Sequence, residues 1–281
     1  MNDTVVSVIR PRNDWLRIDF QVLWRYRDLL WSFVLRDVKV RYRQTILGPL
    51  WLVIQPLTMT GILTAVVHGI AGLKTDNQEP ILFYFSAIIM WQYFAQAVQA
   101  ISQVFIVNEY LFNKVYFPRI VVPTSIVFAN SIGLAIQLVP FFGLMAGLAI
   151  FGKFHPSLAQ IWLMPIALVE LIAASLGVGL IIASSTAKYR DLANATPFLL
   201  QAGLFLTPVL YPLSAVPEKL RLALAFFNPL STICETWRSG AIGGGGVSMT
   251  QFLVSLVSTS LLLFAGIILF QRAERTAADT I

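Results

Sequence analysis

Charged residues, cysteine and histidine are all scarce in this chain of 281 residues. Only 12% of its residues are charged and 57% are hydrophobic, whereas soluble domains have about 25% charged residues. The mean hydropathy is +0.73. This composition excludes an ordinary soluble domain and indicates an integral membrane protein. The single cysteine, Cys234, excludes a disulfide within the chain and a cysteine metal cluster.

The other signals for a bound metal or nucleotide are also missing. His68 and His155 lie at the ends of apolar runs, with no second histidine or carboxylate at metal-ligand spacing, so an interfacial role is favoured. The glycines at 243–246 lack the following Lys-Ser/Thr of a phosphate-binding loop. Lys and Arg exceed Asp and Glu by 20 to 14, but they lie beside apolar runs, which favours topology signals over nucleic-acid binding.

Long apolar segments dominate the remainder. A membrane-spanning helix needs about 20 apolar residues. Six segments are candidates, at 50–70, 81–107, 120–151, 161–187, 195–211 and 252–270. The third is longer than one straight crossing requires, with Pro118 and Pro123 near its start and Pro140 within it, so we expect its ends to bend or to lie in the interface. The sequence predicts an all-α integral membrane protein with one six-span domain over residues 48–281.

The stretch from Arg36 to Trp51 marks the entry into the membrane, because no charged residue occurs between Ile46 and Lys74. Residues 1–24 form a polar lead-in, and 25–47 predict an amphipathic helix in the membrane interface. Its apolar residues recur at helical spacing: Leu30, Trp31, Phe33, Val34, Leu35, Val38 and Tyr42. A helix packed on a cytosolic domain is the alternative.

The distribution of Lys and Arg predicts the orientation. Fifteen lie on the side of the N-terminus and five on the other, so both termini are expected in the cytoplasm. The first thirty residues have no apolar core, and we expect no cleaved signal peptide. The outer segment 212–250 contains a short apolar run broken by Asn228-Pro229, which predicts short re-entrant helices before the last span.

Glu170 is the one ionisable residue deep inside a predicted span. A carboxylate in lipid is costly, so it should face the protein interior or a partner subunit. A structural hydrogen bond is favoured over a proton-carrying role, because no relay partner is visible. Ser184, Ser185, Gly177 and Gly179 suggest helix packing.

Aromatic residues gather in two spans, Trp91, Tyr93 and Phe94 in the second and Phe198, Phe205 and Tyr211 in the fifth. Core packing or anchoring at the interface is the favoured interpretation. If a conduit passes here, flat rings would suit a sugar chain.

Four motifs carry a family resemblance: Leu35–Trp51, Asn113–Arg119, Tyr189–Asp191 and Leu206–Pro212. Together they resemble the permease subunit of polysaccharide-exporting ABC transporters, the type 2 exporter group that moves O-antigen, capsule or teichoic acid chains. The resemblance covers nearly the whole chain from Arg25 onward. It does not specify the glycan.

The resemblance implies a homodimer in the bacterial inner membrane, with two copies of an ATPase subunit and a channel for a lipid-linked glycan. ATP and Mg would bind to the ATPase, and this chain would be no enzyme and carry no cofactor. Implied ATPase contacts are Asn113, Lys114, Tyr116, Phe117, Arg119, Tyr189, Arg190 and Asp191. Arg36, Lys39, Arg41 and Arg43 would meet headgroups or the lipid pyrophosphate. The six aromatic residues above become candidate glycan contacts.

Three alternatives stay open. A drug or small-lipid exporter would share the fold. A membrane enzyme acting on polyprenyl-linked sugar would need a carboxylate or histidine cluster at an interface, which the sequence does not show. A proton-coupled carrier would depend on Glu170.

Overall fold

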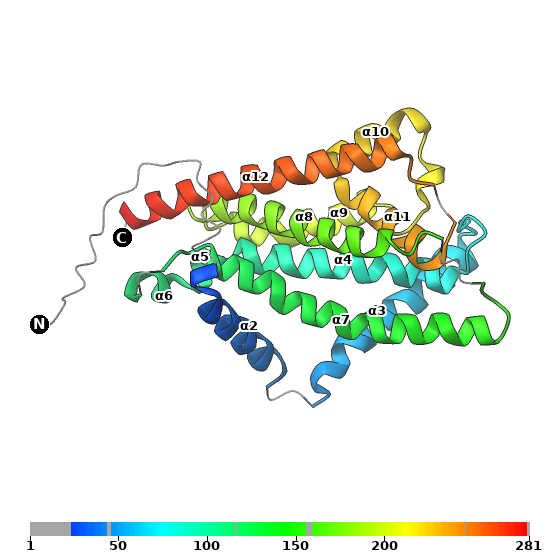
Figure 1. The fold of residues 1–281 in the computed structure, drawn as a ribbon, viewed down its shortest axis with the longest axis horizontal. Coiled ribbons are helices and arrows are strands. Elements are labelled where there is room, and N and C mark those ends of the chain that lie inside the picture. The colour runs from blue at the N-terminus through cyan, green and yellow to red at the C-terminus, as the bar shows by residue number, and fades with distance from the viewer. Residues whose placement is uncertain (1–23, 44–45, 116, 156–158, 245, 280–281) are drawn as a thin grey trace, which may run out of the picture.

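The computed structural model describes residues 24–43, 46–115, 117–155, 159–244 and 246–279. Every regular element within these ranges is a helix, which confirms the all-α prediction (Figure 1). The predicted lead-in, residues 1–24, lies outside the described residues except for Trp24.

The helices follow one another with mostly short connections. They are α2 (Arg27–Tyr42), η1 (Gly48–Leu50), α3 (Trp51–Leu63), η2 (Thr64–Ile70), α4 (Pro80–Ser102), α5 (Val104–Val107), α6 (Glu109–Lys114), α7 (Val121–Ile150), α8 (Leu163–Thr186), α9 (Leu192–Leu206), η3 (Leu213–Ala215), α10 (Glu218–Phe227), α11 (Pro229–Ile242) and α12 (Met249–Asp279).

Five segments are long and apolar enough to cross a membrane: Gly48–Ile70, Pro80–Ser102, Val121–Ile150, Leu163–Thr186 and Met249–Arg275. The fifth predicted span, 195–211, is instead the shorter helix α9 of 15 residues. It stops because Thr207 is extended, at ψ 140°, and Pro208 disfavours helical backbone in the residue before it. The count of six crossings therefore stays a prediction.

Two other predicted spans differ in their ends. The second breaks at Gln103, whose φ of −100° and ψ of 7° separate α4 from the short α5. The third is one helix of 30 residues that continues through Pro140.

Helix α8 lies at the centre of the bundle, packed against α4, α11 and α12. The closest approach joins α8 to α12, where a Cβ added to Gly266 would fall 2.5 Å from the Gly177 carbonyl oxygen. A Cβ on Gly179 would lie 2.8 Å from Ile101 Cβ on α4. Both α8 glycines thus lie at helix contacts, as small residues in a membrane bundle predict.

The two ends of the bundle are built from different elements. At one end lie α5, α6, the 188–191 loop and the last turns of α12, which we call the basic end (Figure 1). At the opposite end lie α10, the start of α12 and the ends of α7 and α11.

Helix α2 leaves the basic end and packs on α7. Its inward face is built from residues 26, 29, 30, 33, 34, 37 and 38, which recur at helical spacing. Trp31 and Leu35 are each 53% exposed, although Trp31 still has its ring 6.2 Å from that of Phe128 on α7. An interfacial position for α2 stays a prediction.

Candidate functional site

Five phenylalanine rings join the elements at the basic end. This phenylalanine cluster consists of Phe33, Phe105, Phe112, Phe117 and Phe270. Phe105 stacks on Phe270 of α12 at 4.8 Å between centroids and lies 5.9 Å from Phe112 of α6. Phe117 lies 5.9 Å from Phe112 and 5.8 Å from Phe33 of α2. The cluster therefore fixes α2, α5, α6 and α12 relative to one another.

Arg119 and Glu274 connect the end of the α6–α7 loop to α12. The Arg119 main-chain N–H donates to Glu274 Oε1 at 3.4 Å, and Arg119 Nη1 donates to the Glu274 main-chain oxygen at 3.2 Å. The guanidinium also lies 5.2 Å from the Phe112 ring centroid. Their side chains are only 14% and 31% exposed, so this pair is shielded more than an ordinary surface pair.

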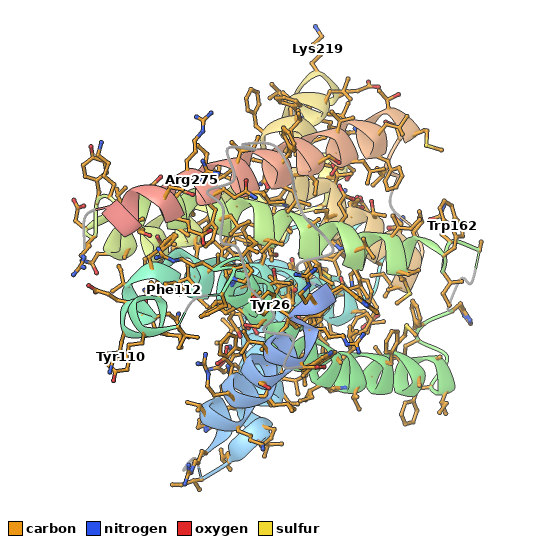
Figure 2. All side chains as sticks on the ribbon, turned by 60° about the vertical axis from the view of Figure 1, so that its left-hand side comes forward. Tyr26, Tyr110, Phe112, Trp162, Lys219 and Arg275 are labelled. Atoms are coloured by element: carbon orange, nitrogen blue, oxygen red, sulfur yellow. The ribbon has the colours of Figure 1, made fainter. Side chains whose placement is uncertain are left out.

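The surface of α6 that faces away from the bundle is exposed. Tyr110 is 71% exposed and points away from the bundle, whereas Phe112 lies inward (Figure 2). Lys114 Nζ donates to the Tyr110 hydroxyl and lies over its ring. Arg190 Nη2 is 3.2 Å from Glu109 Oε2, which joins the 188–191 loop to α6. The two loops implied by the resemblance are thus side by side.

The remaining residues of this predicted group divide between surface and interior. Phe117 is buried in the phenylalanine cluster, whereas Tyr189 and Asp191 are exposed. The side chain of Asn113 and the whole of Tyr116 lie outside the described residues.

The four basic residues predicted to meet headgroups do not converge. Arg36 pairs with its neighbour Asp37 at 2.9 Å, and Arg41 Nη1 donates to Asn130 Oδ1 of α7 at 3.0 Å. Lys39 and Arg43 are exposed. Arg41 therefore also holds α2 against α7.

The aromatic residues proposed for a conduit fall into two environments. Trp91 and Tyr93 are buried in α4, and the Tyr93 hydroxyl lies 3.2 Å from Ser131 Oγ of α7. Phe198 and Phe205 are 73% and 61% exposed on α9. Phe94 and Tyr211 are half-buried. Of these six rings, therefore, only those of Phe198 and Phe205 on α9 are mostly exposed.

Glu170 lies inside the bundle, as predicted. It is 3% exposed and its Oε1 accepts hydrogen bonds from Ser255 at 2.5 Å and Thr259 at 3.3 Å, both on α12. Ser255 Oγ also lies 3.3 Å from the Pro229 carbonyl oxygen. The carboxylate thus links α8, α12 and the start of α11.

Sequence reasoning missed a second buried charged group. Arg238 and Glu235, both on α11, are 0% and 2% exposed, with Nη1 2.7 Å from Oε2. Arg238 Nη2 donates to the Pro208 carbonyl at 3.1 Å, and its guanidinium lies 3.7 Å from the Phe83 ring centroid. The available signal was a Glu and an Arg three residues apart, a spacing that places them on one helix face.

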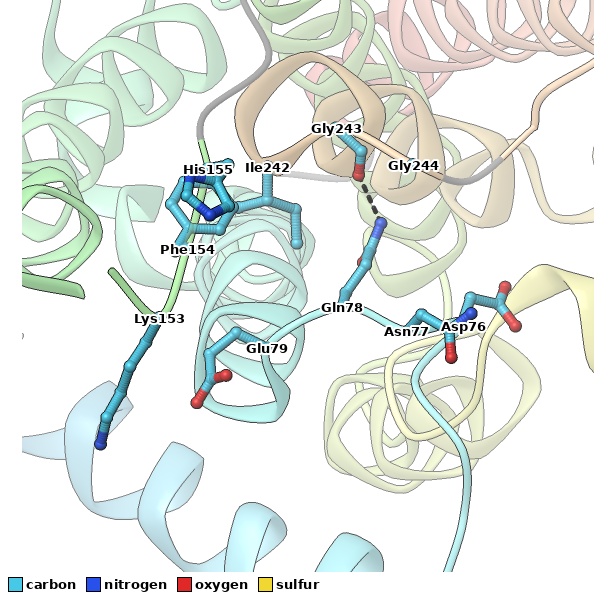
Figure 3. Close-up of a pocket in the computed structure, with 10 residues that line it drawn as sticks. All are labelled: Asp76, Asn77, Gln78, Glu79, Lys153, Phe154, His155, Ile242, Gly243 and Gly244. Atoms are coloured by element: carbon cyan, nitrogen blue, oxygen red, sulfur yellow. Dashed lines mark hydrogen bonds between the residues drawn. The ribbon is translucent and has the colours of Figure 1, made fainter. Parts of the chain in front are cut away.

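A polar cavity of about 330 Å³ lies at the opposite end, between the 76–79 loop, the 153–155 loop and the end of α11 (Figure 3). Gln78 Nε2 donates to the Gly243 carbonyl oxygen at 2.5 Å across it. His155 is on its lining, and among the described residues no group of three His, Cys, Asp or Glu side chains could hold a metal.

Comparison with known proteins identifies the family. The family model of the ABC-2 type transporter matches residues 28–242. The O-antigen export system permease protein RfbA of Klebsiella pneumoniae is 26% identical over 90% of this chain and 94% of its own. The protein of the same name from Myxococcus xanthus is 28% identical over 92% and 97%. The polysialic acid transport protein KpsM of Escherichia coli is 25% identical over 86% and 92%. The chain belongs to the ABC-2 type transporter family.

Proposed function

We propose that this chain is the channel-forming permease subunit of an ABC exporter for a lipid-linked bacterial polysaccharide. The observation that carries the proposal is its near full-length similarity to relatives named as O-antigen export permeases and a polysialic acid transport protein. The subunit would act as a homodimer in the inner membrane with both termini in the cytoplasm. ATP hydrolysis would occur on a separate ATPase subunit.

The basic end is the proposed docking surface for the ATPase. Exposed Tyr110 lies on α6 and exposed Tyr189 lies on the 188–191 loop, and the Arg190–Glu109 pair joins these two elements. The phenylalanine cluster supports this surface from the interior, so a movement of α6 would reach α2 and α12. A rigid support of this kind suits a contact that transmits force.

We expect Arg119→Ala to uncouple ATP hydrolysis from export. The substitution removes the guanidinium that lies against Glu274 and Phe112, so the loop keeps only its main-chain hydrogen bond to Glu274. Export should fall about two- to thirtyfold, the range typical for residues that modulate coupling. Export should be measured per ATP hydrolysed in proteoliposomes, at matched amounts of inserted protein.

Lys219→Ala is the matched control, because Lys219 is an exposed cation at the opposite end of the bundle (Figure 2). It should leave export per ATP unchanged. Equal ratios in Arg119→Ala and wild type would remove the coupling role from Arg119.

The lipid pyrophosphate is proposed to meet the exposed cations of α2. Lys39 and Arg43 have exposed side chains, whereas Arg41 is bound to Asn130 of α7. Guanidinium groups favour bidentate hydrogen bonds to phosphate oxygens. The glycan would then pass the exposed rings of Phe198 and Phe205, whose faces tolerate sliding.

Glu170 is proposed to be structural. We expect Glu170→Gln to retain export and thermal stability, because the amide oxygen can still accept from Ser255 and Thr259. Glu170→Leu should leave the Thr259 hydroxyl without this acceptor and Ser255 with only the Pro229 carbonyl, and lower the free energy of unfolding by about 1–3 kcal/mol. Thermal unfolding in detergent measures this difference. A folded Glu170→Gln protein that loses export together with its pH dependence would favour a proton-coupled carrier.

The proposed function is tested with inverted membrane vesicles that contain the chain and its ATPase subunit. A radiolabelled polyprenyl-pyrophosphate oligosaccharide added outside should become protected from a glycosidase only when ATP is present. Protection that is independent of ATP, or transport of a drug such as ethidium but no glycan, would contradict the proposal.

A further inference from the structure

Helix α12 carries specific contacts at both ends of the bundle. We propose that Glu274 is a positioning residue, through which α12 connects the ATPase-facing loop to the α10–α11 pair at the opposite end. This inference rests on the proposed function and adds the element that relays the ATPase signal.

The contact at the basic end involves both main chain and side chain. Glu274 accepts from the main-chain N–H of Arg119 and, through its own carbonyl, from the Arg119 guanidinium. One turn earlier, Phe270 stacks on Phe105. Because Arg119 ends the loop that follows α6, a displacement of this loop acts directly on α12.

The contacts at the other end hold the junction between α10 and α11. Ser258 Oγ donates to the Phe226 carbonyl at 2.5 Å, in the last turn of α10. Ser255 Oγ lies 3.3 Å from the carbonyl oxygen of Pro229, the first residue of α11. Because these hydroxyls contact main-chain carbonyls, a movement of α12 would displace the backbone of the junction and not only a side chain.

Between these contacts α12 is suited to move as one body. It is a single helix of 31 residues without proline. Ser258 and Glu274 are 16 residues apart, about 24 Å along the axis at 1.5 Å per residue. The close contact with α8, at Gly266 and Gly177, lies midway. A tilt of α12 about this contact would displace its two ends in opposite directions.

The charged and polar partners along α12 support this assignment. Glu170 of α8 accepts hydrogen bonds from Ser255 and Thr259 of α12. These bonds hold the half of α12 near α10 against α8, at the centre of the bundle. At the other end of α12, Glu274 is hydrogen-bonded to Arg119. Both halves of α12 therefore have polar contacts with other elements.

The test measures how fast a cysteine on α10 is modified. Lys219 is exposed, and the native Cys234 is fully buried, so Lys219→Cys gives one reactive thiol. The permease–ATPase complex in nanodiscs is treated with a charged maleimide, with and without ATP and orthovanadate. In the otherwise wild-type complex, nucleotide should change the labelling rate about two- to thirtyfold.

Three variants and one control then separate relay from folding. Glu274→Ala removes the acceptor of the Arg119 main-chain N–H but keeps the main-chain carbonyl that accepts from the guanidinium, so it should reduce the nucleotide-dependent change while the bound ATPase and the thermal unfolding temperature stay near wild type. Glu274→Gln should restore part of it, because its amide oxygen can accept from Arg119. Ser258→Ala, at the other end, should also reduce it. Ser260→Ala is the control, since its exposed hydroxyl bonds only to Leu256 within α12.

A full nucleotide response in Glu274→Ala would overturn the inference, as would an equal loss in Ser260→Ala. An absent response in wild type with the ATPase bound would overturn it too. If no ATPase subunit binds at all, the proposed function fails, and that outcome is distinct from the others.

Discussion

Replacing Arg238 by methionine is expected to destabilise the protein by about 3–5 kcal/mol, the usual effect of leaving one member of a buried ion pair unpaired. Glu235 would be left at 2% exposure with no cation beside it. The Pro208 carbonyl and the Phe83 ring would lose the same guanidinium. We expect little protein in the membrane fraction and a sharply lowered thermal unfolding temperature in detergent.

A double variant separates the charge from the packing. Arg238→Met with Glu235→Met replaces the pair by apolar side chains of similar length, and such replacements are often neutral. Yield and unfolding temperature should then recover most of the loss. A single Arg238→Met variant as stable as wild type would show that the pair does not hold α11 in place.

Gly266→Ala is expected to lower the free energy of unfolding by about 1–3 kcal/mol, the usual range for overpacking. Its Cβ would lie 2.5 Å from the Gly177 carbonyl oxygen, and main chain cannot rotate aside as a side chain can. The helices α8 and α12 would have to separate. Thermal unfolding of the purified protein measures the change.

Gly143→Ala provides the comparison, because Gly143 also lies within a helix and nothing stands within 4 Å of its added Cβ. Its stability should stay level or rise slightly, since alanine favours helix more than glycine does. Equal stability of the two variants would mean that α8 and α12 do not approach each other as described.

The fold class and most of the helices could be predicted from the sequence, because apolar runs of spanning length need few other assumptions. The end of the fifth segment could not. Its hydrophobic composition continues past Leu206, but Thr207 and Pro208 stop the helix for local backbone reasons. The mean hydropathy over a window of residues does not detect such a local helix end.

The loops at Asn113–Arg119 and Tyr189–Asp191 were grouped by the family resemblance and not by their spacing. Arg190 and Glu109, which form an ion pair between the 188–191 loop and α6, are 81 residues apart. Glu274 was not predicted, because its partner Arg119 lies 155 residues away. In the count of Lys and Arg, Arg238 was one of the five placed on the outer side. Its burial was not predicted, because it depends on α4 and α8 packing around α11.

The central claim, that this permease moves a lipid-linked glycan with energy from a separate ATPase, is tested most directly by purification and transport together. The chain, expressed with an ABC ATPase subunit from the same source, should copurify with that subunit in a one-to-one ratio. The reconstituted complex should move a polyprenyl-pyrophosphate oligosaccharide across the membrane only with hydrolysable ATP. A stable permease that binds no ATPase subunit, or a complex that hydrolyses ATP without moving the glycan, would contradict the account.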